Sequence, residues 1–480
     1  MIAETGSGKV EGFVDEGCNV FLGIPYAAPP LGKNRFGPPV PHDPWDETRE
    51  CFAYGPTAPQ RDPGITIIPE PVEAGDDFLN LNIYTPDLSA NLPVFVWIHG
   101  GGFVSGCNRS PWYRGTRFAR DGVVLVSIGY RLGVEGFLDI EGAPANRAVL
   151  DWIAALRFVQ ENIANFGGDP SRVTIGGQSA GSAACLTLMV NPLAQGLFRG
   201  VIAMSGTSDT RMPRDVLRDA CGKLASHLGV SATTEGLGRF SPNELVDAWD
   251  GLFGNPFTAD AVARGFDPRS PSLKPFVDGD VISDHPFRSI GASAIPLLAG
   301  STTQEINGSV RMRRKDLEAV APGALDAMQI SGDVRDAYAK HVGSSDPVEL
   351  LAQAVTDRAF RIPLARLLED RVASDTPTWG YQFAWRSPER DDSTAMHCID
   401  IPFAFDNLDA EGVTDVGRVG TGAPQSLADE MHGDWVRFIT DGAVSWPAYA
   451  SATRPVMVFD DRRAVRPDVL RVERELLAAR

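Results

Sequence analysis

Residues 171–190 read SRVTIGGQSAGSAACLTLMV. The short apolar run VTI, closed by glycines, predicts a buried strand, and the small-residue run after Ser179 predicts a helix. Between them lies the pentapeptide Gly177-Gln178-Ser179-Ala180-Gly181, a GxSxG pattern. A serine on a tight turn between a strand and a helix is exposed, and the helix N-terminus points partial positive charge at a developing oxyanion. The stretch therefore predicts Ser179 as a nucleophile.

Strand-like and helix-like segments alternate outward from this turn. Apolar runs typical of buried strands cover 94–100, 123–130, 171–177 and 201–206, and residues 147–163 carry apolar side chains at helical spacing. Such alternation predicts a parallel sheet with helices on both faces. Together with the serine turn it predicts the α/β class and the α/β-hydrolase fold, in which a large, mostly parallel central sheet is flanked by helices.

The second half of the chain is less regular. Residues 214–290 and 308–375 look mainly helical, whereas 295–300, 379–385 and 456–459 look like later strands. There is no internal repeat and no low-complexity linker. We therefore expect a single domain over residues 1–480, with mainly helical insertions over the active site at about 208–290 and 308–395.

Composition excludes several classes of function. The chain has 480 residues, 43% of them hydrophobic, and a net charge of −18, which repels a phosphate backbone, so we expect no nucleic-acid partner. No apolar run is long enough for a membrane span. The start, MIAETGSGKVEGFV, lacks the features of a targeting segment, so we expect a cytoplasmic protein. The six cysteines and scattered histidines match no metal motif, and we expect neither a metal nor a cofactor.

A second glycine motif follows the strand-like run that ends at Ile98. It reads His99-Gly100-Gly101-Gly102-Phe103. Acyl transfer builds negative charge on a carbonyl oxygen, and glycines allow backbone N–H donors to approach that oxygen closely. Because this loop lies upstream of the serine, as in lipases and esterases, it predicts an oxyanion hole.

A serine nucleophile needs a histidine base oriented by a carboxylate, in the chain order serine, acid, histidine. Among the five histidines after Ser179, position after the 379–385 strand favours His397 over His432, which lies in surroundings typical of a solvated surface. Glu305 follows the end of the strand at 295–300 and is the favoured acid. Its rivals are Asp209, Asp278 and Asp284.

Seven further segments carry a resemblance to a known family. They are GIPYAAPPLGKNRF (23–36), DDFLNLNIYTP (76–86), GYRLGVEGFL (129–138), NIANFGGDPSRVTIGGQSAG (162–181), MSGT (204–207), STTQE (301–305) and AMHCIDIPFAF (395–405). Over almost its whole length the chain resembles the type-B carboxylesterase and cholinesterase family, nearest its bacterial nitrobenzyl-esterase and carbamate-hydrolase types. The resemblance implies that Ser179, Glu305 and His397 form a catalytic triad.

The same resemblance implies supporting parts of the site. The oxyanion hole would consist of the N–H groups of Gly101, Gly102 and Ala180. Ser205 would support the histidine, and Gln178 would line the pocket beside the serine. Two structural ion pairs are also implied, one between Arg35 and Asp76 and one between Arg131 and Asp151.

Departures from the family pattern bear on the substrate. The family usually has a glutamate where this chain has Gln178, and the loop 61–75, which holds a cation-binding tryptophan in cholinesterases, contains no aromatic residue. Both changes weaken recognition of a cation. Glu135 replaces a residue that is usually phenylalanine, a change that the sequence does not explain.

These observations predict a serine carboxylesterase that hydrolyses uncharged carboxylic esters, or carbamates, through an acyl-enzyme intermediate. Its partner would be a small-molecule ester, and the chain would be a monomer or a homodimer. One alternative is a non-catalytic binding protein of the same fold, since fold does not imply activity. The other is a lipase, which would need a long apolar lid that the sequence does not show.

Overall fold

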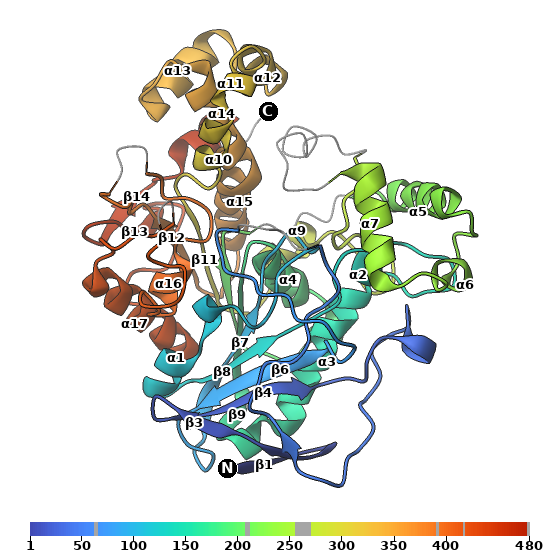
Figure 1. Ribbon diagram of the computed structural model, residues 1–480. Coiled ribbons are helices and arrows are strands. Elements are labelled where there is room, and N and C mark those ends of the chain that lie inside the picture. The colour runs from blue at the N-terminus through green and yellow to red at the C-terminus, as the bar shows by residue number, and fades with distance from the viewer. Residues whose placement is uncertain (62–65, 207–211, 255–269, 390–392, 416–417, 478–480) are drawn as a thin grey trace.

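A large mixed sheet runs through the middle of the molecule (Figure 1). The computed structural model describes residues 1–61, 66–206, 212–254, 270–389, 393–415 and 418–477. Its strands are β1 (Ile2–Thr5), β2 (Gly8–Glu11), β3 (Phe13–Asp15), β4 (Cys18–Pro25), β5 (Arg49–Glu50), β6 (Asn80–Thr85), β7 (Leu92–Ile98), β8 (Val124–Ile128), β9 (Gly168–Gln178), β10 (Gly200–Met204), β11 (Leu297–Thr302), β12 (Thr378–Phe383), β13 (Pro455–Phe459) and β14 (Ala464–Pro467).

The order of strands in the large sheet is β14-β13-β12-β11-β10-β9-β7-β8-β6-β4-β3. From β13 to β8 every neighbouring pair is parallel, while β14 at one edge and β6, β4 and β3 at the other pair antiparallel. A small separate sheet contains β1, β2 and β5. The predicted α/β class with a mostly parallel central sheet is confirmed.

Helices cover the sheet and form two outlying groups. They are α1 (Thr116–Arg120), α2 (Gly133–Phe137), α3 (Arg147–Asn162), α4 (Ala180–Met189), α5 (Arg214–Leu228), α6 (Thr234–Leu237), α7 (Pro242–Phe253), α9 (Pro286–Ser289), α10 (Asn307–Met312), α11 (Arg314–Leu317), α12 (Ala321–Ala327), α13 (Gly332–Val342), α14 (Pro347–Thr356), α15 (Ile362–Arg371), α16 (Ile401–Ala404) and α17 (Gln425–Asp441). In Figure 1, α5–α7 gather at the right and α11–α14 at the top. None of the helices in the described ranges is long and apolar enough to cross a membrane.

Strand β7 shows how the core divides. Its side chains alternate between two apolar clusters, because successive residues of a strand point to opposite faces of the sheet. Val96 belongs to the cluster that contains Trp152 of α3, whereas Trp97 belongs to the cluster that contains Trp435 of α17. Both faces of the strand are fully buried, which is why its sequence reads as a continuous apolar run rather than an alternating one.

Buried ion pairs fix the helices beside the sheet. Arg131 Nη2 lies 2.6 Å from Asp151 Oδ1 of α3 with both side chains fully buried, as expected. The expected pair between Arg35 and Asp76 is wrong. Asp76 is exposed, and Arg35 Nη2 instead lies 2.6 Å from Glu135 Oε1 of α2. Glu135 is buried and needs a partner charge, so its replacement of an apolar residue has a structural reason.

Candidate active site

The predicted site residues lie at one edge of the sheet, where its parallel strands end. His99 and the glycine loop follow β7, Ser179 follows β9, Ser205 follows β10, and Glu305 comes three residues after β11. The carboxyl ends of parallel strands share one edge, and such sheets bind their ligands there. His397 belongs to the segment after β12, the neighbour of β11 in the sheet.

Ser179 sits on a tight turn between β9 and α4. Its φ of 57° and ψ of −121° put it in a conformation that residues other than glycine rarely adopt. The turn is possible because strand and helix approach closely: a Cβ on Gly181 would overlap the carbonyl oxygen of Ile98 in β7. Ser179 N also donates to Met204 O of β10 at 2.9 Å. The serine is thus held by three neighbouring strands and one helix.

The glycine loop lies directly against this turn. A Cβ on Gly100 would be 3.3 Å from the Cβ of Ser179. Gly101 has φ 102°, and a Cβ there would overlap the carbonyl oxygen of Ser105, so the position requires glycine. Within the described ranges, the N–H groups of Gly101 and Gly102 donate no hydrogen bond, and the Ala180 N–H opens α4, where N–H groups have no partner in the helix. These N–H groups can donate hydrogen bonds to an oxyanion.

His99 belongs to the scaffold of this loop. Its Nδ1 lies 2.8 Å from Gly100 O, and its ring stacks on Tyr130 at 4.4 Å between centroids. Burial lowers the pKa of His99 to about 4, against a smaller opposing effect of the Gly100 carbonyl. The imidazole is therefore neutral at working pH and supports the loop.

His397 and Glu305 form a close pair. His397 Nδ1 lies 2.5 Å from Glu305 Oε2, and Thr302 N donates to Glu305 Oε1 at 2.8 Å. The backbone joins the two segments again, because His397 N donates to Glu305 O at 2.8 Å. Burial acts to lower the pKa of His397, but Cys398 and Glu305 outweigh it, and the pKa of His397 is raised well above its ordinary value. This geometry orients an imidazole by a carboxylate.

Gln178 lies against the imidazole of His397. It is fully buried, and its Nε2 is 3.1 Å from His397 Nε2. No hydrogen bond between the Ser179 hydroxyl and His397 is present in the part of the chain that the structure describes. Gln178 Nε2 is also 3.4 Å from His397 Nδ1, so the amide lies against the imidazole ring and not in line with the lone pair of Nε2. Gln178 Oε1 is buried and has no hydrogen-bond partner among the described residues.

Ser205 and the rival acids fall in different places. Ser205 is buried beside the turn at Ser179, but its hydroxyl has no hydrogen-bond partner among the described residues. Its support of His397 therefore stays a prediction. Asp278 accepts from Asn146 Nδ2 at 2.6 Å, and Asp284 pairs with Arg288 on α9. Asp209 lies outside the described residues.

The description of His432 as solvated surface is wrong. It is buried in α17, where its Nδ1 lies 2.9 Å from Ala404 O and its Nε2 lies 3.1 Å from Asp121 Oδ2. The apolar face of α17 turns it inward, although its neighbours in the sequence are polar. It joins α17 to α16 and to the residue that follows α1, and neither of these bonds involves Glu305 or Ser179.

Two further residues near the His397–Glu305 pair were not anticipated. The ring of Phe360 lies 5.0 Å from the His397 ring, and Phe360 stands on a π-helical turn, Asp357–Arg361, between α14 and α15. Asp400 is fully buried and accepts from Tyr381 Oη at 3.0 Å; burial and then the Glu305 charge raise its pKa to about 7. Asp400 is the one charged residue in the apolar stretch CIDIPF (398–403) after His397, and this was a signal in the sequence. No local pattern marks Phe360.

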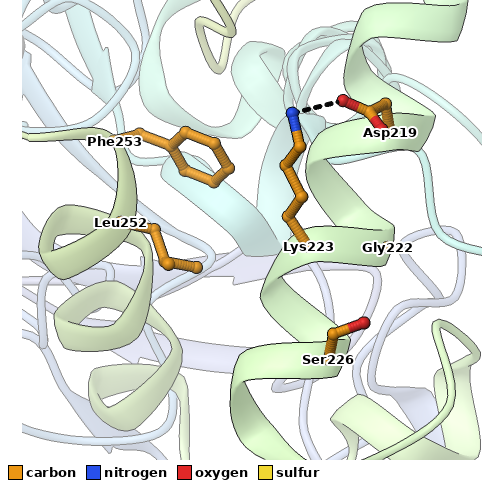
Figure 2. A pocket seen from close by; sticks show the side chains of 6 residues that line it. All are labelled: Asp219, Gly222, Lys223, Ser226, Leu252 and Phe253. Carbon is orange, nitrogen blue, oxygen red and sulfur yellow. Dashed lines mark ion pairs between the residues drawn. The ribbon is translucent and has the colours of Figure 1, made fainter.

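A separate pocket of about 730 Å³ lies between α5 and α7 (Figure 2). Its lining contains Lys223 and Asp219, whose charged atoms are 2.6 Å apart on the same helix face, and Phe253 across from them. None of the predicted site residues lines this pocket. It is a surface hollow between two helices, and the chemistry described above lies elsewhere.

The chain was compared with known proteins and structures. The model of the carboxylesterase family matches residues 1–473. The para-nitrobenzyl esterase of Bacillus subtilis is 32% identical over 98% of this chain and 96% of its own, and the phenmedipham hydrolase of Pseudarthrobacter oxydans is 33% identical over 97% and 98%. A crystal structure of a carboxylesterase from Geobacillus stearothermophilus superimposes with a TM-score of 0.85 at 31% identity, covering 99% of both chains.

Proposed function

The chain belongs to the carboxylesterase family and is a carboxylic ester hydrolase. We propose that it cleaves uncharged carboxylic esters, with carbamates as a second class of substrate. In this proposal the reaction passes through an acyl-enzyme on Ser179. The observation that carries this proposal is the position of Ser179. It stands on a strained turn between the unused N–H groups of the glycine loop and the segment in which His397 lies 2.5 Å from Glu305. The two alternative functions, a non-catalytic binding protein and a lipase, have no comparable observation in their favour.

The proposed reaction begins at His397 Nε2. That nitrogen takes the proton from Ser179 Oγ, and the oxygen attacks the carbonyl carbon. The N–H groups of Gly101, Gly102 and Ala180 stabilise the negative charge on the carbonyl oxygen. His397 then gives its proton to the leaving alcohol, and a water, deprotonated by the same imidazole, releases the acid and regenerates Ser179. Glu305 holds the imidazole in place and stabilises its charged form.

The substrate preference rests on Gln178 and on two relatives. A neutral amide beside the nucleophile adds no charge to attract a cation. The names of the Bacillus and Pseudarthrobacter relatives refer to para-nitrobenzyl esters and to phenmedipham, which supports esters and carbamates as classes to test. No cofactor is part of the proposed reaction. A monomeric or homodimeric state and a cytoplasmic location stay predictions.

A covalent titration tests the proposed nucleophile. The protein is incubated with a serine-reactive organophosphate, and intact mass and peptide mapping locate the adduct. We expect one adduct per chain, on Ser179, with loss of hydrolysis in proportion. Labelling at another residue, or full hydrolysis after Ser179 is labelled, would contradict the proposal. A panel of nitrophenyl esters of increasing acyl length then measures the preferred acyl group.

A further inference from the structure

The loop that carries Glu305 has two sets of hydrogen bonds to the rest of the protein. One set joins it to the segment of the proposed base, where His397 N donates to Glu305 O at 2.8 Å. The other set joins it to the last turn of α14, which contributes the side chains of Gln353 and Thr356. Both side chains are buried. Buried polar groups are normally hydrogen-bonded, and the partners of these two are the residues on either side of the acid.

Thr356 holds the chain directly after the acid. Its Oγ1 accepts from Ile306 N at 3.1 Å and donates to Asn307 Oδ1 at 2.7 Å. Asn307 is itself buried, at the start of α10. A hydroxyl has one proton to donate, and this one uses its proton and a lone pair on the two residues that follow Glu305. Its removal would leave a buried N–H and a buried amide oxygen without these partners.

Gln353 holds the chain before the acid. Its Nε2 donates to Thr303 O at 3.2 Å and to Asp357 Oδ1 at 2.8 Å, while its Oε1 accepts from Asn307 Nδ2 at 3.0 Å. A carbonyl oxygen and an ionised carboxylate can only accept, so this orientation of the amide is the one that satisfies both. Gln353 therefore ties together Thr303 and Asn307, and Glu305 lies midway between them in the chain.

The turn that follows α14 reaches the proposed base. This is the π-helical turn Asp357–Arg361, and the ring of its Phe360 lies 5.0 Å from the ring of His397. π-Helical turns are frequent at functional sites. One short stretch, residues 353–361, thus contacts both the loop of the acid and the ring of the base, although none of the three triad residues belongs to it.

The placement of Glu305 decides how well its carboxylate orients the imidazole, which lies 2.5 Å away at His397 Nδ1. A misplacement of about 1 Å in such a site can cost about a hundredfold in rate. We propose that Thr356 and Gln353 are positioning residues, which hold the loop 303–307 so that its carboxylate meets the imidazole. This inference rests on the proposed function, because it takes Glu305 as the acid of the triad.

Two substitutions of one residue, Thr356→Val and Thr356→Ser, test the proposal. Valine has the shape of threonine without the hydroxyl, whereas serine keeps the hydroxyl and loses only a methyl group. We expect Thr356→Val to lower kcat on a nitrophenyl ester by about tenfold or more. KM should change little, because Thr356 is fully buried and has no surface for a substrate. Thr356→Ser should recover most of the lost kcat.

The pH profile separates positioning from a general loss of stability. Burial acts to lower the pKa of His397, and Cys398 and Glu305 act to raise it. A displaced Glu305 stabilises the imidazolium less, so Thr356→Val should move the midpoint of kcat/KM to lower pH. Cys398 and Asp400, the other titratable groups that act on the imidazole, are unchanged in this variant.

Thr378→Val is the matched control. Thr378 is buried at the first residue of β12, at the end of the strand opposite to the proposed site, and its Oγ1 accepts from Arg371 Nε at 3.0 Å. The same chemical change there also removes the acceptor of a buried donor, so it should lower the free energy of unfolding. It should leave kcat and the pH midpoint as they are in the wild-type protein.

A folded Thr356→Val protein with the kcat and the pH midpoint of the wild type would overturn the positioning role. If Thr356→Val does not fold, Gln353→Met carries the same test, because methionine has nearly the length of glutamine without its amide. Either change should cause no further loss of kcat in a Glu305→Gln protein if it acts through Glu305, and an undiminished further loss would overturn the role.

The Glu305→Gln protein also separates this inference from the proposed function. A strong effect of Glu305→Gln without an effect of Thr356→Val or Gln353→Met would overturn the positioning role and leave the triad intact. An unchanged rate and pH midpoint in Glu305→Gln would instead overturn the triad. Absence of ester hydrolysis by the wild-type protein would overturn the proposed function as a whole.

Discussion

The backbone conformation of Ser179 is strained, and the contacts of its own side chain do not relieve that strain. A non-glycine residue in such a conformation is strained by about 1–3 kcal/mol, and the neighbouring β7, β9 and β10 must hold it there. The hydroxyl gains exposure at the strand end from this arrangement. Strain at this single residue is consistent with its proposed role, because an active-site geometry persists only where the surroundings determine it.

Ser179→Ala should abolish ester hydrolysis and leave the fold intact. Without the nucleophile the rate should fall by about 10⁴-fold or more. His397→Ala should have a similar effect, because the two residues act as one unit. The measurement is kcat/KM on a nitrophenyl ester, with circular dichroism to verify folding. Inactivation by His432→Ala in a folded protein, with His397→Ala active, would show that the wrong histidine was chosen.

Activity should rise with pH, with a midpoint above the ordinary histidine value of about 6.5. The imidazole must be neutral to accept a proton, and the pKa of His397 is raised despite its burial, in part by Glu305. Glu305→Gln should therefore move the midpoint of kcat/KM downward and lower kcat. Asp284→Asn, an exposed rival acid paired with Arg288, is the control. A midpoint for Glu305→Gln equal to or above that of the wild type would contradict the pairing.

Sequence alone could predict the residues that local patterns mark. Ser179 and the glycines after His99 lie in motifs whose strand and turn context is visible within a few residues. Gln178 was expected in the pocket, but its position against His397 Nε2 depends on two segments 219 residues apart. No local pattern marks Phe360, whose ring lies 5.0 Å from that of His397.

At the scale of elements, the close packing of α4 against β7 decides whether the tight turn at Ser179 forms. Gly181 stands where a Cβ would meet the backbone of Ile98. Backbone atoms cannot move aside as the end of a side chain can, so the helix itself would have to shift. The strands that the sequence predicted differ from those observed by a few residues at most. For example, 94–100 is observed as Leu92–Ile98, because the chain leaves the sheet where the glycine loop begins.

Gly181→Ala should destabilise the protein and reduce hydrolysis together. Overpacking of this kind costs typically about 1–3 kcal/mol. The free energy of unfolding from urea titration and kcat/KM measure the two effects. Gly222→Ala in α5, where a Cβ would meet no other atom within 4 Å, is the control: it should leave kcat/KM unchanged and raise the free energy of unfolding by up to about 1 kcal/mol, because alanine favours a helix more than glycine does. A Gly181→Ala protein with unchanged stability and activity would show that α4 can move away from β7.

At the scale of the whole molecule, a buried ionic cluster joins the C-terminal segment to the helices after β11. Arg361 of the π-helical turn pairs with Glu473 and also with Asp357, whose Oδ2 accepts from Tyr338 Oη at 2.5 Å. His341 approaches Asp357 and Glu473 closely enough to be considered with them as metal ligands, but both carboxylates already pair with Arg361. This arrangement was invisible in the sequence, since its members come from three separate segments.

Glu473→Ala should lower the free energy of unfolding by about 1–3 kcal/mol, because buried N–H groups of Arg361 would lose their hydrogen-bond acceptor. Thermal or urea unfolding measures the loss. Glu475→Ala is the control two residues away, where the side chain is exposed and pairs with Arg471 on the surface, and it should have no measurable effect. Equal stability of the two variants would mean that the C-terminal segment contributes little to the folded state.

The turn at Ser179 also implies that the active site forms late in folding. Its geometry depends on β7, β10 and α4, and the imidazole that serves it comes from a segment beyond β12, so no local piece of chain can build the site by itself. Contacts between distant segments form late, because loop closure has to precede them. Recovery of hydrolysis after dilution from denaturant should therefore lag behind recovery of helical signal. The return of hydrolysis therefore measures when the last long-range strand contacts have formed, whereas compaction and secondary structure report only on earlier steps.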